Sequence, residues 1–155
     1  MRLKRLYKWL AAVVVAAIII CLGLFVYKRS MQRAEQRVKA FVHVINYEYK
    51  APEKMYKYFT KAYRQEISEA DFVEAFNKER SYPYLTPLFL NYESIEMDKD
   101  DRSAVAIFSQ AARLPGMIVE INLVYENGDY YVHYFEEFLD GSYLDKFERL
   151  DMGGE

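Results

Sequence analysis

The chain has 155 residues, of which 17% are aromatic, and it contains only 6 Gly and 4 Pro. This composition is typical of a packed domain and excludes a disordered stalk or a flexible linker as the main body. The single cysteine, Cys21, excludes a disulfide within the chain and a zinc site built from cysteines.

Charge is distributed unevenly along the chain. Residues 31–155 hold 15 basic and all 23 acidic side chains, which gives them a net charge of −8. Within this part, residues 31–80 carry a net charge of +2 and residues 81–155 a net charge of −10. Because an acidic domain repels phosphate groups, nucleic acid is not expected as a partner.

An uncharged run of nineteen residues, WLAAVVVAAIIICLGLFVY at positions 9–27, contains no proline. As a helix it would be roughly 28 Å long, close to the thickness of the bilayer hydrocarbon core. We therefore predict a transmembrane helix over residues 9–27. Trp9 and Tyr27 stand at its two ends, where aromatic side chains favour the membrane–water interface. Cys21 is expected to be a lipid-facing apolar side chain, with palmitoylation as the lesser alternative.

Basic residues flank this run on both sides, so a count of Lys and Arg alone leaves its orientation nearly undecided. A short basic tail, MRLKRLYK at residues 1–8, followed by an apolar stretch is typical of a secretory signal and favours a cytoplasmic N-terminus. The residues after the run, KRSMQR, lack the small side chains of a cleavage site. We predict an uncleaved, single-pass signal-anchor in the cell membrane. Residues 28–140 would then form an extracytoplasmic domain, and residues 141–155 a C-terminal tail that can form a short helix.

Three helices are predicted in the first part of the domain. Apolar residues recur at spacings of three and four over residues 31–50, which predicts a helix that continues the membrane helix or follows it after a short break. Pro52 suits the first turn of a second helix, predicted over residues 52–63. Ser68 and Asp71 are spaced as in a capping box, which predicts a third helix from Ser68 to about residue 79.

Four strands are predicted after these helices, over residues 88–97, 103–112, 117–126 and 129–138. Asn127 and Gly128 are typical of a two-residue hairpin turn, and this turn fixes the register of the last two strands. One side of the hairpin is then apolar or aromatic and should face the helices; it pairs Tyr125 with Tyr130, Leu123 with Val132, and Ile121 with Tyr134. The other side is mixed; it pairs Val124 with Tyr131, Asn122 with His133, and Glu120 with Phe135.

Two stretches carry a resemblance to a known family: ISEADFVEAF at residues 67–76, after two helices, and the hairpin ENGDYYVHYF at residues 126–135. The chain resembles the NTF2-like (cystatin-like) superfamily, and within it small bacterial membrane-anchored members. The resemblance covers residues 31–138. It implies an α+β fold in which three helices pack on a curved four-stranded antiparallel sheet to form a cone, often with a pocket at its open end. This fold hosts enzymes, binding proteins and assembly parts, so it implies no activity.

The sequence indicates no catalytic or metal site. Common hydrolase, metalloprotease and nucleotide-binding motifs are absent. His133 falls on the mixed side of the predicted hairpin, and His43 is predicted on a helix surface. Glu136 and Glu137 would point to opposite faces of a strand and would not converge on a cation. We therefore expect a protein that is not an enzyme and that needs no metal and no cofactor.

If the cone holds a ligand, its candidate lining is Tyr125, Tyr130 and Tyr134. Core packing is the expectation for most of the other tyrosines, because a phenol can bury its ring and still reach water with its hydroxyl. Arg33 and Arg37 are expected at the membrane interface against anionic headgroups.

The expected function is that of a membrane-tethered, non-enzymatic extracytoplasmic domain for binding or assembly. Its partners would be the lipid bilayer and either another envelope protein or a second copy of the chain. Two alternatives stay open. One is a small-molecule-binding protein or enzyme that uses the cone pocket, and the other is a homo-oligomeric stalk that extends the membrane helix.

Overall fold

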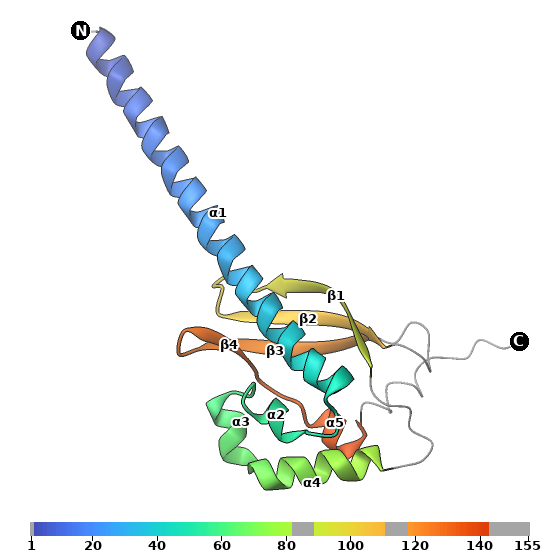
Figure 1. The fold of residues 1–155 in the computed structure, drawn as a ribbon. Helices are drawn as coiled ribbons and strands as arrows, with labels where there is room; N and C mark the ends of the chain where they lie inside the picture. The colour runs from blue at the N-terminus through green and yellow to red at the C-terminus, as the bar shows by residue number, and fades with distance from the viewer. Residues whose placement is uncertain (1, 82–88, 111–117, 143–155) are drawn as a thin grey trace, which may run out of the picture.

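The computed structural model describes residues 2–81, 89–110 and 118–142. The chain is an α+β protein in which a long N-terminal helix leads into short helices and an open four-stranded antiparallel sheet (Figure 1). The helices are α1 (Arg2–Tyr47), α2 (Glu53–Tyr56), α3 (Lys61–Glu66), α4 (Glu69–Arg80) and α5 (Glu137–Asp140). The strands follow one another in the sheet in the order of the sequence: β1 (Leu90–Met97), β2 (Ser103–Gln110), β3 (Ile118–Glu126) and β4 (Asp129–Val132).

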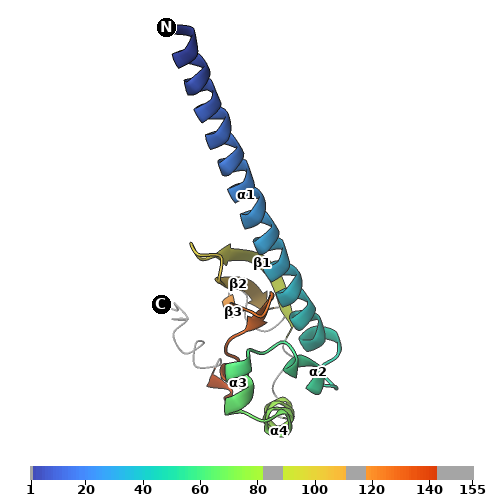
Figure 2. The ribbon, with the colours of Figure 1, turned by 90° about the vertical axis from the view of Figure 1, so that its left-hand side faces the viewer.

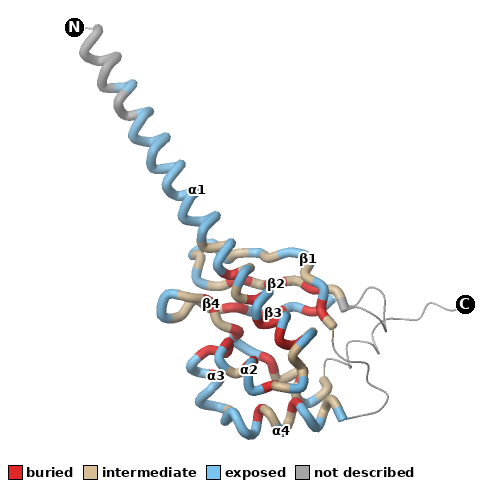
Figure 3. Tube along the Cα trace, viewed as in Figure 1, coloured by how far each residue is buried: buried red, intermediate tan, exposed pale blue. Residues whose placement is uncertain are grey.

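Helix α1 joins the apolar run and the first predicted domain helix into one helix of 46 residues. Of the two predicted alternatives, a continuous helix or a short break, the structure has the continuous helix. The two halves of α1 have different surroundings, because the first projects away from the domain and the second packs against the sheet (Figure 3). α1 is long and apolar enough to cross a membrane, and an N-terminal signal sequence would have the same properties.

The second half of α1 lies against one face of the sheet (Figure 2). Its Ala34, Val38, Phe41 and Ile45 side chains are fully buried at helical spacing. The strand residues that face them alternate with outward ones, and the buried set comprises Leu90, Ala104, Ala106, Phe108, Val119, Ile121, Leu123, Tyr130 and Val132. The core of the domain is therefore the contact between one helix and one sheet face.

The predicted single helix over residues 52–63 is wrong, because the structure has two short helices, α2 and α3, with an extended stretch between them. In that stretch Phe59 forms a parallel bridge to Val132, and the Thr60 amide donates to the Val132 carbonyl at 3.0 Å. Thr60 also caps α3, since its side chain accepts a hydrogen bond from the Tyr63 amide. Pairing with the edge of the sheet therefore replaces about one turn of helix.

The predicted hairpin register is confirmed for Leu123 with Val132, Val124 with Tyr131 and Tyr125 with Tyr130. The His133 amide still donates to the Asn122 carbonyl at 2.9 Å, but β4 itself ends at Val132. The predicted strand over residues 129–138 is therefore too long.

The structure also contradicts the last two predicted pairs of the hairpin. Tyr134 is 50% exposed, whereas Phe135, predicted on the mixed side, is buried. Phe135 packs edge-on against Phe41 and stacks on Phe138, with ring centroids 5.2 and 4.6 Å apart. Because the alternation of a strand would place Phe135 on the outer face, the chain leaves the sheet and turns into α5.

Other predicted boundaries agree closely with the structure where it describes them. Ser68 caps α4, and its side chain accepts the Asp71 amide as the capping pattern predicted. Strand β1 carries a bulge between Tyr92 and Ser94, which the sequence did not indicate. Residues 88, 111, 112 and 117, and the predicted tail helix beyond residue 142, lie outside the described residues.

One side chain connects the end of α1 to the start of β1 and generates a first prediction. The Asn46 amide group donates to the Leu90 carbonyl and accepts from the Leu90 amide, both at 2.9 Å, and Leu90 is buried. Asn46→Ala should lower the free energy of unfolding by about 2 kcal/mol, because two backbone groups lose their partner. Urea unfolding of the full chain in detergent measures this. Gln36→Ala, at an exposed position of the same helix, is the control, and an equal effect of both variants would contradict the assignment.

Candidate functional site

Tyr130, a predicted ligand-lining residue, is fully buried where three elements meet. Its hydroxyl donates to the Asp101 carbonyl at 2.6 Å and accepts from the Ser30 hydroxyl. Burial raises the pKa of the Tyr130 phenol, while the Ser30 hydrogen bond acts in the opposite direction. Tyr130 therefore joins α1, the turn between β1 and β2, and strand β4, and its hydroxyl is already engaged by the protein.

The two other predicted lining residues lie apart from each other. Tyr125 is half-buried, and its ring meets that of Tyr130 edge-on with centroids 5.2 Å apart. Tyr134 lies outside the buried face and hydrogen-bonds the Glu136 carboxylate, which raises the pKa of its phenol. The structure thus brings together Tyr125 and Tyr130 but not Tyr134, and a ligand-binding role for them stays a prediction.

Arg37, predicted at the membrane interface, holds α1 onto the edge of the domain. Its Nε donates to the Tyr130 carbonyl at 3.0 Å and its Nη2 to the Lys57 carbonyl at 3.2 Å. Its Nη1 lies 3.6 Å from an Asp129 carboxylate oxygen, and the guanidinium lies over the ring of Tyr58 at 4.5 Å. These contacts use the planar, multiply donating character of the guanidinium group.

The remaining predicted interface residues are exposed on α1. Trp9 is 74% and Tyr27 42% exposed along the apolar half of the helix, and Arg33 is exposed one turn before Arg37. Their placement at a membrane interface stays a prediction.

A hollow lies between α1 and the turn that connects β1 and β2, with a volume of about 370 Å³. We call it the α1–turn hollow; it is lined by Phe25, Val26, Arg29, Ser30, Arg33, Asp100, Asp101, Arg102 and Tyr125. Of these, only Arg33 and Tyr125 were predicted as site residues. No local pattern indicates the rest, because the two sides of the hollow are some seventy residues apart in the chain.

Asp101 is the residue of the hollow with the least usual environment. It has a positive φ of 55°, a conformation that Asp and Asn adopt more readily than most residues. Its carbonyl accepts from Tyr130, whereas the carboxylate oxygen Oδ1 is buried without a hydrogen-bond partner among the described residues. A buried acceptor without a donor is costly and points to a missing partner.

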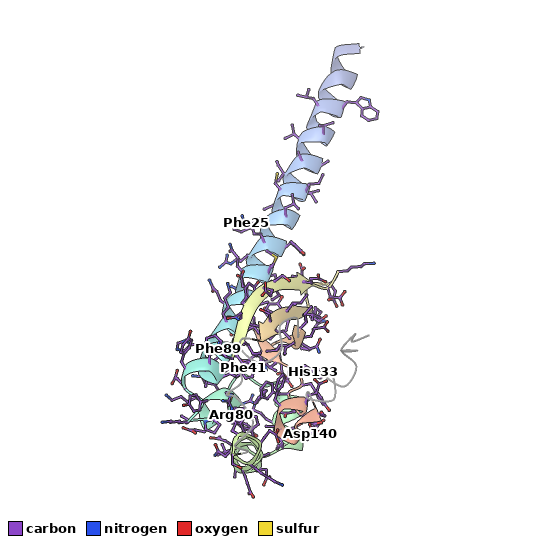
Figure 4. All side chains as sticks on the ribbon, turned by 90° about the vertical axis from the view of Figure 1, so that its right-hand side faces the viewer. Phe25, Phe41, Arg80, Phe89, His133 and Asp140 are labelled. Atoms are coloured by element: carbon purple, nitrogen blue, oxygen red, sulfur yellow. The ribbon has the colours of Figure 1, made fainter. Side chains whose placement is uncertain are left out.

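The histidines do not form a site in the described part of the chain. His43 is exposed on α1, its Nε2 lies 3.8 Å from a Glu48 carboxylate oxygen, and its ring lies beside Tyr47. His133 is exposed at the outer side of the sheet next to Asn122, in a surface hollow that also contains Glu96. Figure 4 labels His133 on the side of the domain away from α1. Within residues 2–81, 89–110 and 118–142, no group of three or more His, Cys, Asp or Glu side chains could hold a metal ion.

Tyr63 is a buried polar residue that sequence reasoning did not single out. Its side chain is buried beside α5, and its hydroxyl has no hydrogen-bond partner among the described residues. Burial, and next the nearby Glu136 carboxylate, raise its pKa far above that of a free phenol. Close by, burial and the Asp140 carboxylate raise the pKa of Glu79. No spacing in the sequence identifies such an environment, since it depends on how Tyr63 lies against Tyr134 and Glu136, some seventy residues away in the chain.

Comparison with known protein families and with curated proteins finds no match to this chain. The chain's own residues show a long apolar N-terminal helix and a domain made of helices and a four-stranded antiparallel sheet.

The unpartnered hydroxyl of Tyr63 generates a second prediction. Tyr63→Phe should raise the free energy of unfolding by about 1 kcal/mol, because it removes a buried group that has lost its hydration without gaining a bond. Tyr130→Phe should instead lower it by about 1 kcal/mol, since that hydroxyl has two partners. Urea unfolding at neutral pH compares the two variants, and a destabilising Tyr63→Phe would contradict a buried Tyr63 hydroxyl without a partner.

The raised pKa of Tyr63 also predicts how stability changes at alkaline pH. In the unfolded chain the phenol ionises near its ordinary pKa of 10.0, while in the folded chain it stays protonated to higher pH. The contribution of the protonated Tyr63 phenol to the free energy of unfolding is fully present below pH 10 and is lost as the pH rises above 10. Stability should therefore fall less steeply above pH 10 in Tyr63→Phe than in the natural chain. Identical slopes in thermal unfolding from pH 9 to 11 would contradict this.

The contacts of Arg37 generate a third prediction. Arg37→Gln should lower the free energy of unfolding by about 2 kcal/mol, because it removes charged hydrogen bonds and a cation–π contact. Lys28→Gln is the matched control, since Lys28 is exposed on the same helix and forms no ion pair or cation–π contact with the described residues. Loss of such an exposed charge should change the free energy of unfolding by roughly 0.5 kcal/mol or less. Equal effects of the two variants in urea unfolding would contradict the structural role of Arg37.

Proposed function

We propose that the chain is a membrane-tethered, non-enzymatic extracytoplasmic domain for binding or assembly. Its partner is another envelope protein or a second copy of itself. The observation that carries the proposal is α1, whose exposed apolar half continues without a break into the helix that forms the core of the domain.

A continuous helix couples the domain to the membrane in a defined position. Hydrogen bonds from Ser30 and Arg37 to β4 hold α1 just after its apolar half ends. A flexible tether would let the domain rotate freely, whereas this arrangement fixes which surfaces face the membrane and which face away. α2, α3 and α4 lie at the end of the domain farthest from the apolar half (Figure 1). A fixed orientation of this kind suits a part that docks onto an assembly.

An NTF2-like cone is the finer fold that this arrangement supports. α1 packs on the inner face of an antiparallel meander, as that family implies, with the shorter helices at one end. Phe41, Phe59, Phe72 and Phe135 pack ring against ring in the interior. Packing of this kind favours binding on the outer surface over a ligand inside the cone.

The outer face of the sheet is the surface that we assign to the partner. Val105, Ile107, Ile118 and Val124 alternate with the buried residues and so point outward. No described element covers them, and Ile118 is 58% exposed. Apolar side chains along one exposed sheet face are typical of an interaction surface.

The contacts of the basic flank support an N-terminus in the cytoplasm. After the apolar run, Arg37 pairs with Asp129 and Lys39 pairs with Glu35. The cations left closest to the run on that side are Lys28, Arg29 and Arg33, against four in the tail of residues 1–8. The excess of Lys and Arg then lies on the side of the tail, which by the positive-inside rule stays in the cytoplasm.

Site-specific photo-crosslinking in cells that make the full chain tests the proposal. A crosslinker at Ile107, on the outer sheet face, should give a discrete adduct, while the same group at Glu74, exposed on α4, should not. An adduct of twice the chain's mass identifies a second copy, and another mass identifies a different partner. The chain should also resist carbonate extraction and be digested by protease added outside spheroplasts. No adduct from Ile107, or loss of the chain from the membrane fraction, would refute the proposal.

A further inference from the structure

The α1–turn hollow spans the level at which the apolar part of α1 ends. Phe25 and Val26 belong to the uncharged run, while Arg29, Ser30 and Arg33 follow within about two turns of the helix. Figure 4 shows Phe25 on α1 just above the domain. If the run lies in a bilayer, one end of the hollow meets the hydrocarbon and the other meets the headgroups.

Three cations of the hollow have no anionic partner of their own. Arg29 and Arg33 on α1 and Arg102 on the turn are exposed, and none lies within ion-pair distance of a described carboxylate. Arg37 and Lys39, on the same helix, do have such partners. Arginine is the side chain best suited to a phosphate group, because its planar fork donates two parallel hydrogen bonds.

The turn supplies an acceptor next to these cations. Asp101 lines the hollow as a half-buried residue, and it is fixed by the hydrogen bond from Tyr130 to its carbonyl. Its Oδ1 is covered by the protein and has no donor among the described residues, so the carboxylate still lacks a group that donates hydrogen bonds and carries positive charge. The hollow thus offers a phosphate-binding side, a cation-binding side and an apolar end formed by Phe25 and Val26.

We propose that the α1–turn hollow binds the headgroup of a bilayer phospholipid that carries both a phosphate and a primary ammonium group, as phosphatidylethanolamine does. Arg29, Arg33 and Arg102 hold the phosphate. Asp101 accepts from the ammonium, and the acyl chains run along Phe25 and Val26. The inference rests on the membrane tether of the proposed function, and it adds a specific lipid ligand that fixes the domain against the bilayer surface.

General attraction to anionic lipid predicts a different preference. Phosphatidylglycerol has the phosphate and glycerol hydroxyls that can donate to Asp101, but it has no positive charge to pair with the carboxylate. Phosphatidylcholine has the phosphate and a quaternary ammonium without N–H groups, so it cannot donate to Asp101. Comparison of the three headgroups therefore separates the proposed site from a surface that only attracts negative charge.

Native mass spectrometry of the full chain in detergent, with each lipid added in turn at equal concentration, tests the site. Phosphatidylethanolamine should be retained about tenfold more than either of the other two, which corresponds to about 1.4 kcal/mol. Arg33→Gln and Arg102→Gln should each lower its retention about tenfold. Asp101→Asn should abolish the preference over phosphatidylcholine, and asparagine tolerates the positive φ at this position.

Lys28→Gln and Lys99→Gln are the matched controls, because they remove one charge from the same helix and the same turn without lining the hollow. Circular dichroism melting should be equal for all five variants. The proposal is overturned if the arginine variants lose no more lipid than the controls, if phosphatidylglycerol is retained as well as phosphatidylethanolamine, or if Asp101→Asn keeps the preference. Lipid retention is measured without a protein partner, so a failure to retain lipid is distinct from a missing crosslink at Ile107. Loss of the membrane tether is detected separately, as loss of the chain from the membrane fraction.

Discussion

Burial of the second half of α1 on the inner face of the sheet is the contact on which the rest of this structure depends. Ala34, Val38, Phe41 and Ile45 are fully buried there, and every strand of the sheet contributes residues to the same layer. The inner face of this sheet is lined by buried apolar side chains, and without α1 it would lie open to water. The domain therefore cannot be separated from the helix that also carries the apolar N-terminal run. Whatever holds the first half of α1 also sets the position of the domain.

This shared helix explains why several charged and polar side chains near the apolar run act within the protein. Arg37 is close enough to the run to be expected at headgroups, yet the edge of β4 and the α2–α3 connection take up its hydrogen-bonding groups. Tyr130 is likewise committed to Ser30 and Asp101. Arg29, Arg33 and Arg102 differ because they face the α1–turn hollow, where neither α1 nor the turn offers them a carboxylate at ion-pair distance. Packing, and not position in the chain, therefore decides which of these cations bind within the domain and which can bind a ligand.

Much of the fold follows from local patterns in the sequence. Helical spacing, the Ser68 cap and the Asn127 turn act over a few residues, so they predicted most of α1, α4 and the register next to the hairpin. The failures occur where distant contacts overrule local preference. Residues 57–60 leave the helix because Thr60 pairs with Val132, and residues 134–138 leave the strand because Phe135 packs among Phe41, Phe59 and Phe72. Of the hollow, the sequence indicated only Arg33 and Tyr125, since its walls come from segments far apart in the chain.

The sequence by itself determined the presence of a helix long and apolar enough to span a membrane, the α+β class and the two-residue hairpin, because each depends on the local order of apolar, polar and turn-forming residues. Only the tertiary structure decided that Arg37 belongs to the domain, that Tyr63 is buried without a partner, and that Asp101 stands beside three arginines. These properties depend on distances between side chains that the chain brings together from opposite ends. Local propensity carries no information about such distances, because they are fixed only when α1 packs on the sheet.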